Sequence, residues 1–234
     1  RSSLQGKLLS KPEIVEKLEY QDYLPAIFFI FSRTGCESAV RQCMQAGLTL
    51  TRPNERERIK KVIEEKTREL ASEDYGIVGF HEWVDALMRG IAAHHAGLLP
   101  MFKETVEILF QQGLVRIVFA TETLALGINM PAHTVILEKL TKWNGEGHVS
   151  ITPGEYTQLT GRAGRRGIDI EGHAVIIWNN TVDSGIAAGL ASARTYPLKS
   201  SFIPSYNMSA NLVSRFGFER ARKSLAASFA QFQA

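Results

Sequence analysis

The sequence predicts an α/β protein built on a parallel sheet. Short continuous runs of apolar residues, such as AIFFIF at residues 26–31 and VRIVFA at residues 115–120, are typical of strands buried on both faces. Segments with helical spacing, each about 10 to 15 residues long, lie between these runs. Because strands that alternate with helices favour a doubly wound sheet, we expect helices on both faces of five parallel strands.

Composition allows one full domain with an appendage and gives little overall charge. The chain has 234 residues, of which 44% are hydrophobic, and a net charge of +3. Residues 180–234 hold six Lys or Arg against two Asp or Glu, so this tail carries +4 and the rest of the chain −1. Any binding of nucleic acid must therefore come from local patches.

The cysteines and the apolar runs bear on the cellular location. Cys36 and Cys43 lie seven residues apart in a helical stretch, which predicts two reduced thiols rather than a disulfide. The longest apolar run covers residues 25–31, far short of the ~20 residues that a membrane span needs. The first residues show no charged-then-apolar stretch, so we expect no export signal. We expect a cytoplasmic protein with no membrane partner.

The first half of the chain predicts one strand and two helices after a polar start. Residues 1–24 are polar with a helical stretch, PEIVEKLEY, and they are typical of a connection from an upstream domain. After the strand at residues 26–31, Ser32 begins a turn, and the helix that follows ends at Gly47. The highly charged residues 51–69 predict a solvated helix with one narrow apolar stripe.

The second half continues the alternation. The predicted helix at residues 100–112 ends at Gly113, and the other strands are expected at residues 91–95, 115–120, 134–140 and 173–178. A loop is predicted for residues 143–150. It precedes a capping box, Thr152 to Glu155, which begins a further helix. Pro197 and Pro204 mark a linker before two amphipathic helices, at residues 206–215 and 218–232.

Residues 156–168, YTQLTGRAGRRGI, which we call the arginine segment, place three arginines among three glycines. Arg162 and Arg165 are three apart and would point the same way on a helix end, whereas Arg166 would point elsewhere. Planar guanidinium groups bind phosphate oxygens two at a time. The glycines follow a helix and precede a strand, the reverse of a dinucleotide fingerprint. No GxxxxGK[ST] occurs in the chain, so the segment predicts a surface that supplies arginines without a nucleotide cradle.

Ligands of open α/β sheets bind at the carboxyl ends of the strands, and we expect four segments there. They are residues 32–34, 94–97, 120–131 and 156–168. Residues 32–34 combine hydroxyls, a guanidinium and a helix N-terminus, which suits phosphate, with an ordinary helix cap as the alternative. Adjacent His94 and His95 on a strand would point to opposite faces. Since no cysteine or acidic cluster joins them, we expect no metal site.

Four segments, taken together and in order, resemble a known family. They are AIFFIFSRTGCE, RGIAAHHAGLLP, FATETLALGINMPAHTVI and YTQLTGRAGRRGID. They are similar to motif IV, the HHAG strand, motif V and motif VI of superfamily 2 DExH helicases. The similarity is greatest to the superkiller and exosome-associated RNA helicases, including bacterial members. The resemblance implies a second RecA-like domain at residues 25–196, and a linker with the first helices of a winged-helix-type module at residues 197–234.

The resemblance also implies roles for single residues. Arg162 and Arg165 match arginines that face the γ-phosphate of ATP, and Gln158 matches a glutamine near that phosphate. Gly127 and Asn129 match positions that line the ATP cleft, although many relatives outside this group carry aspartate in place of Asn129. The matches to positions on or beside the nucleic-acid backbone are Ser32, Arg33, His95, Gly97, Thr121 and Thr123.

The implied cofactor and partners lie largely outside this chain. ATP with Mg²⁺ would be held mainly by an upstream RecA-like domain, because this chain has neither the lysine loop nor a DExH segment. The other partner would be single-stranded RNA or DNA. Two alternatives stay open: a non-enzymatic nucleic-acid-binding module with the basic tail as its footprint, and a dinucleotide or nucleotide-sugar enzyme. The latter needs a glycine loop after an early strand, which FSRTGCE does not provide.

Overall fold

The computed structural model describes residues 9–125, 129–178, 182–192, 202 and 204–228. The chain divides into two compact units, Arg1–Ser192 and Ala193–Ala234. The first unit contains the sheet and its covering helices. The second contains a pair of short helices.

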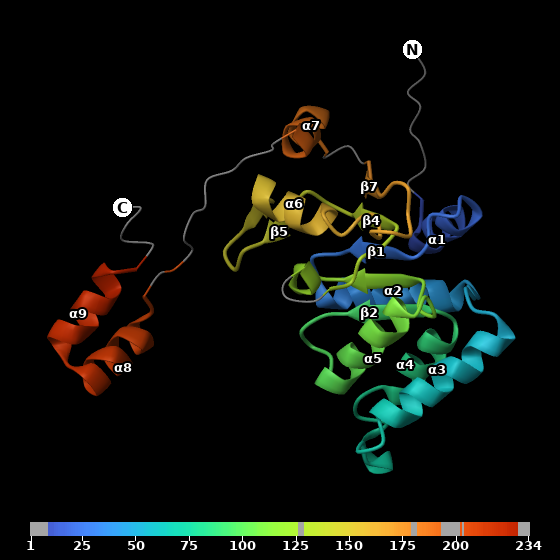
Figure 1. Ribbon diagram of the computed structural model, residues 1–234, viewed down its shortest axis with the longest axis horizontal. Coiled ribbons are helices and arrows are strands. Elements are labelled where there is room, and N and C mark those ends of the chain that lie inside the picture. The colour runs from blue at the N-terminus through green and yellow to red at the C-terminus, as the bar shows by residue number, and fades with distance from the viewer. Residues whose placement is uncertain (1–8, 126–128, 179–181, 193–201, 203, 229–234) are drawn as a thin grey trace. The chain divides into compact units, whose positions relative to one another are not determined.

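The first unit is built on a five-stranded parallel sheet, as the sequence predicts (Figure 1). Its strand order is β2-β3-β1-β4-β7. Phe29 lies opposite both Ala120 and Leu137, so the last residues of three neighbouring strands are level with one another. The strands are β1 (Ala26–Phe29), β2 (Ile91–His94), β3 (Ile117–Ala120), β4 (Thr134–Leu137) and β7 (His173–Ile176).

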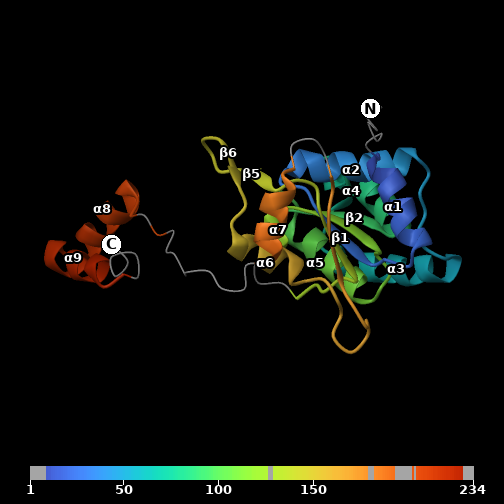
Figure 2. The same cartoon turned by 90° about the horizontal axis from the view of Figure 1, so that it is seen from above.

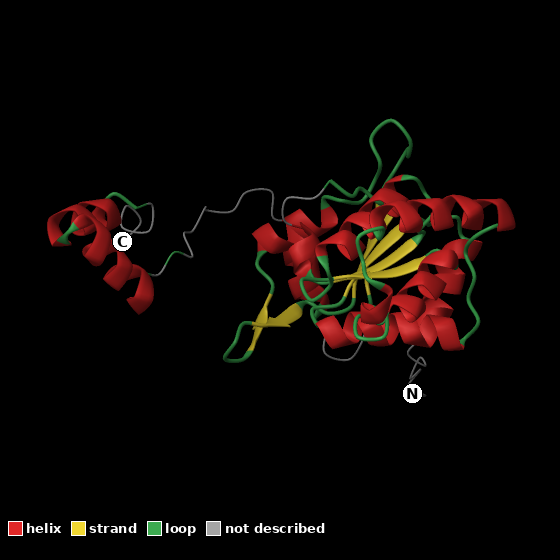
Figure 3. Cartoon of the chain, turned by 90° about the horizontal axis from the view of Figure 1, so that it is seen from below, coloured by secondary structure: helices red, strands yellow, loops and turns green. Residues whose placement is uncertain are grey.

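The apolar runs form strands because both faces of the sheet are covered by helices (Figure 3). In β1, Ile27 and Phe29 pack into one hydrophobic cluster, whereas Ala26 and Phe28 pack into the other. Helices α1 (Lys11–Tyr20) and α2 (Arg33–Gln45) contribute to the second cluster. The first cluster draws on α3 (Pro53–Lys66), α4 (Phe80–Met88), α5 (Pro100–Gln111), α6 (Pro153–Thr160) and α7 (Ser184–Ser192).

Both cysteines lie on the buried side of α2. Cys36 and Cys43 are free thiols, as predicted, and burial raises the pKa of each to about 12. They are therefore inert packing residues at neutral pH. Within the part of the chain that the structure describes, no helix is long and apolar enough to cross a membrane.

An antiparallel hairpin replaces most of the loop predicted at residues 143–150. Strands β5 (Thr141–Trp143) and β6 (His148–Ser150) pair outside the main sheet (Figure 2). The Asn144 Oδ1 atom accepts hydrogen bonds from the backbone N–H groups of Glu146 and Gly147, and Gly145 has a φ of 104°. An Asn-Gly pair between strand-like residues is a hairpin signal, and it was present in the sequence.

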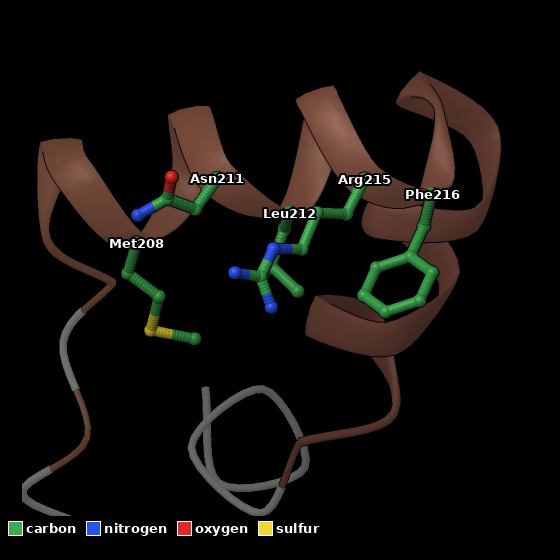
Figure 4. Close-up of a pocket in the computed structure, with 5 residues that line it drawn as sticks. All are labelled: Met208, Asn211, Leu212, Arg215 and Phe216. Carbon is green, nitrogen blue, oxygen red and sulfur yellow. The ribbon is translucent and has the colours of Figure 1, made fainter.

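The second unit contains α8 (Tyr206–Phe216) and α9 (Phe218–Ala226). Both predicted helices form, although residues 229–232 of the second prediction lie outside the described residues. Gly217, with a φ of 77°, separates the two helices. Figure 4 shows the side chains that line a shallow pocket on one side of α8, namely Met208, Asn211, Leu212, Arg215 and Phe216.

Candidate functional site: two polar surfaces at opposite ends of the sheet

The ends of β2, β3 and β1 bring three of the predicted segments to one edge of the sheet. The backbone N–H of Ile30 donates to the carbonyl oxygen of Ala120 at 2.8 Å, and that of Thr121 donates to His94 at 3.2 Å. The residues that follow these strands therefore lie close together. We call them the carboxyl-edge cluster: Ser32, Arg33, His95, Gly97, Thr121 and Thr123.

Hydroxyl groups of this cluster are paired, and several of its side chains are open to solvent. Ser32 caps α2, since its Oγ accepts from the Gly35 N–H at 3.2 Å. The Thr121 and Thr123 hydroxyl oxygens are 2.9 Å apart. Ser32, Arg33 and Thr123 are exposed. Ser32 therefore acts as a helix cap. The Arg33 guanidinium remains exposed in the first turn of α2, where N–H groups and positive charge together could bind a backbone phosphate.

His95 is the buried histidine of the carboxyl-edge cluster. The residue is 2% exposed, and its Nδ1 accepts a hydrogen bond from the Gly97 N–H at 3.2 Å. The proton therefore sits on Nε2, which lies 3.4 Å from Oε1 of Glu37. A Cβ on Gly97 would come within 3.1 Å of the imidazole and 3.5 Å of Arg33 Cδ. The imidazole thus supports the turn beside Arg33 rather than presenting itself to a ligand.

His94 points to the other face, as predicted. Its Nε2 lies 2.8 Å from Oε1 of Glu107 on α5, whereas Glu37 belongs to α2. Burial is the main influence on both imidazoles and lowers the pKa of each. Among the described residues, no group of three or more His, Cys, Asp or Glu is placed to hold a metal ion.

The arginines of the arginine segment lie at the opposite edge, so their expected position at the carboxyl ends was wrong. Ala132, which precedes β4, donates its N–H to the Arg162 carbonyl at 2.9 Å and accepts from the Gly164 N–H at 2.7 Å. Helix α6 runs back along the sheet and delivers the segment to the start of β7. In a parallel sheet, the residues before a strand lie at its amino end.

Arg162 and Arg165 also do not share a helix end. Helix α6 ends at Thr160 with Gly161 as its C-cap, and Gly164, with a φ of 88°, turns the chain away before Arg165. The i, i+3 argument therefore fails. Arg162 is half-buried, and burial lowers its pKa, whereas Arg166 is exposed.

Arg165 forms an ion pair with Asp169, a residue that the sequence did not indicate as part of the site. Its Nε donates to Asp169 Oδ2 at 2.9 Å, its Nη2 to Oδ1 at 2.7 Å, and its backbone N–H to Oδ2 at 2.8 Å. These hydrogen bonds lower the pKa of Asp169 to about 2 and raise that of Arg165. The i, i+4 spacing of the two opposite charges was the available signal.

Gln158 is not brought beside Arg165. It is exposed on α6 and lines a pocket with Phe31 and Glu122, which follow the carboxyl ends of β1 and β3. Arg165 lines a different pocket, together with Glu19, Asp22, Leu24, Pro25, Gly113 and Arg116 at the amino ends of the strands.

The motif V residues are only partly described. Asn129 is exposed, and its carbonyl oxygen accepts a hydrogen bond from Gln111 Nε2 at the end of α5, at 3.2 Å. Gly113, just beyond that end, lines the same pocket as Arg165. Asn129 therefore borders the amino edge. Gly127 lies outside the described residues.

Gly172 allows the arginine segment to lie against the start of β7. A Cβ at this position would be 2.3 Å from the Gly164 nitrogen and 2.5 Å from the Ala163 carbonyl carbon. Both atoms belong to the backbone, so the clash could not be relieved by a side-chain rotation. The position of the segment depends on this close approach.

Known proteins resemble the chain along most of its length. Residues 78–167 match the helicase conserved C-terminal domain. The chain is 59% identical over 224 residues to the probable helicase HelY of Mycobacterium tuberculosis, an alignment that covers 96% of this chain and 25% of HelY. The chain contains a helicase conserved C-terminal domain.

Two eukaryotic relatives support the same assignment of this helicase C-terminal domain. The antiviral helicase SKI2 of Saccharomyces cerevisiae is 38% identical over 203 residues, which are 86% of this chain and 16% of that protein. The ATP-dependent RNA helicase mtr4 of Schizosaccharomyces pombe is 37% identical over 201 residues, or 86% of this chain and 18% of that protein. The chain thus spans a quarter or less of the length of each of these three relatives. The resemblance to the superkiller and exosome-associated helicases is confirmed.

Proposed function

We propose that this chain contains the second RecA-like domain of an ATP-dependent helicase. In this proposal its amino edge supplies Arg162 and Arg165 to an ATP held by an upstream domain, and its carboxyl edge binds a nucleic-acid strand. The observation that carries the proposal is the presence of two polar surfaces at opposite ends of one parallel sheet. A motor that couples nucleotide to nucleic acid needs two such surfaces on one rigid body.

The amino edge has the chemistry to stabilise charge on phosphate. Arg165 uses Nε and one Nη2 proton for Asp169, and a guanidinium has five N–H donors, so Nη1 and the second Nη2 proton are left for an oxygen anion. Bound ATP with Mg²⁺ would supply the phosphoryl group and its leaving group. Arg162 and Arg165 would contact the γ-phosphate, with Gly127 and Asn129 along the cleft. Gln158, which lines the other pocket, would need a rearrangement to join them.

The carboxyl edge has the groups that recognise a nucleic-acid backbone. Arg33 offers a guanidinium, Ser32 and Thr123 offer exposed hydroxyls, and the first turn of α2 offers N–H groups. Contacts of this kind position a strand without reading its sequence. The similarity to the ATP-dependent RNA helicase mtr4 favours RNA as the strand.

The boundaries of the domains follow from the same proposal. Residues 1–24 would lead in from the upstream RecA-like domain, residues 25–196 would form the second RecA-like domain, and residues 197–234 would begin a winged-helix-type module. The two helices of the second unit, and the pocket on α8 that Leu212 and Phe216 help to line, support the last assignment.

Arg165→Ala in the longer protein tests the proposal. Removing an arginine finger costs ~10³- to 10⁵-fold in rate in well-studied nucleotide hydrolases, so ATPase and unwinding should fall by orders of magnitude. Binding of single-stranded RNA or DNA should stay within about threefold, because Arg165 lies at the other end of the sheet. Arg166→Ala, a neighbouring exposed arginine, is the matched control.

Steady-state ATPase rates and fluorescence anisotropy with a labelled strand provide the measurements. A variant that keeps more than about a tenth of wild-type ATPase would contradict the finger role. Salt-sensitive binding with no effect of ATP, once the upstream half is present, would instead favour a non-enzymatic nucleic-acid-binding module.

A further inference from the structure

Both carboxylate oxygens of Asp169 accept hydrogen bonds from Arg165. Its Oδ2 receives both the backbone N–H and the Nε of Arg165, and its Oδ1 receives Nη2, at distances from 2.7 to 2.9 Å. The carboxylate is 7% exposed, whereas the Arg165 side chain is 26% exposed. The Asp169 carboxylate is therefore held within the protein, whereas the Arg165 side chain is partly open to solvent.

We propose that Asp169 is a positioning residue that fixes Arg165 for contact with a phosphate oxyanion. The inference rests on the proposed function, because it needs Arg165 to act on ATP. Bonds at Nε and at one side of Nη2 occupy the lateral fork of the guanidinium, so the end fork of Nη1 and Nη2 is the part that stays available. The same bonds remove the rotational freedom of a long side chain before the phosphate arrives.

The surroundings of Arg165 show why such a restraint matters. Its pocket also contains Glu19 and Asp22, two carboxylates that would attract an unrestrained guanidinium. The other arginine of the pocket, Arg116, is already bound to Glu55 through Nη2 at 2.8 Å. Without Asp169, the Arg165 guanidinium could pair with Glu19 or Asp22 instead. Asp169 thus holds the guanidinium beside the backbone of the arginine segment.

Asp169→Asn in the full-length helicase is the test. The amide keeps the shape but loses the charge and one acceptor, so Arg165 should lose its fixed orientation. We expect kcat for ATP hydrolysis to fall about 10- to 100-fold, as for a misplaced catalytic group. The KM for ATP and the affinity for a single strand should change by less than about threefold. Glu171→Gln, an exposed acid on the same loop, is the matched control.

The double variant separates positioning from a general structural role. If Asp169 acts through Arg165, adding Asp169→Asn to Arg165→Ala should lower kcat no further. A wild-type kcat in Asp169→Asn, or an additional loss in the Arg165→Ala background, would overturn the inference. If Arg165→Ala itself retains full ATPase, the finger proposal fails instead.

A second variant covers a loss of folding. Asp169→Glu keeps the negative charge but is one methylene longer, so it should displace the guanidinium while preserving the ion pair. We expect a kcat between those of the wild type and Asp169→Asn, with an unchanged melting temperature. A wild-type kcat in Asp169→Glu would count against a role for the precise reach of Asp169 and overturn the inference.

Discussion

The two histidines at the end of β2 show how one residue step changes a role. His94 packs toward α5 and Glu107, whereas His95 packs toward α2 and supports the turn at Gly97. Strand alternation makes this division predictable from the sequence. The burial of His95 was not, because a short motif does not reveal how deep its side chain lies.

The buried histidines predict a loss of stability in mild acid. Burial lowers the folded-state pKa of His94 and of His95, so the unfolded state binds more protons and stability rises with pH. Their contribution is complete above the unfolded pKa of about 6.5 and is lost as the pH falls through the lower folded values. Denaturant unfolding of the purified chain at pH 7.5, 6.5 and 5.5 should show this decline.

His94→Gln should make the decline shallower while lowering stability at pH 7.5. The variant removes one of the two protonation sites but also leaves Glu107 without its buried partner. His148→Gln, at an exposed position in the hairpin, is a suitable control and should leave the slope unchanged. A His94→Gln slope equal to that of the wild type would show that His94 does not contribute.

Among the elements, the core strands were predictable and the details of the arginine segment were not. Continuous apolar runs identify β1 and β3 because both faces of these strands are buried. The orientation of Arg162 and Arg165 was not predictable, since it depends on the turn at Gly164 after α6 and on a pairing with Ala132 that is distant in sequence.

Gly172→Ala should disrupt the arginine segment more than the sheet. The new methyl group would lie 2.3 Å from the Gly164 nitrogen, so the backbone of residues 162–165 must move. We expect a large loss of ATPase in the longer protein, ~100-fold if the arginines shift by about 1 Å. Gly147→Ala, at an open position in the hairpin turn, should have little effect.

Hydrogen exchange can separate these outcomes. In Gly172→Ala, the amide of Ala132, which donates to Arg162, should exchange faster, whereas amides of β1 and β3 should stay protected. Normal ATPase together with unchanged protection at Ala132 would mean that the close approach at Gly172 does not position the arginines.

At the scale of the whole molecule, the sequence indicated the doubly wound sheet and both polar surfaces, but placed them at one edge. The general tendency of ligands to bind at carboxyl ends misled the prediction for the arginine segment. The arginines of that segment follow α6 and precede β7, so chain direction alone assigns them to the amino edge. The strand order, β2-β3-β1-β4-β7, could not be derived from apolar runs, which carry no information about neighbours.

The isolated chain should hydrolyse ATP at a negligible rate. It contains neither a GxxxxGK[ST] loop nor a DExH segment, so the arginines have no nucleotide to act upon. A phosphate-release assay on purified residues 1–234, compared with Arg165→Ala, measures this directly. Arginine-dependent turnover by the chain alone would contradict the proposal that the nucleotide is held elsewhere.

The shortness of the core strands has a mechanical consequence. Each strand of the main sheet has four residues, so only ~13 Å of tightly packed backbone separates the two edges. Such a slab cannot bend or stretch appreciably between its ends. A rotation imposed at the amino edge would therefore turn the carboxyl edge through the same angle.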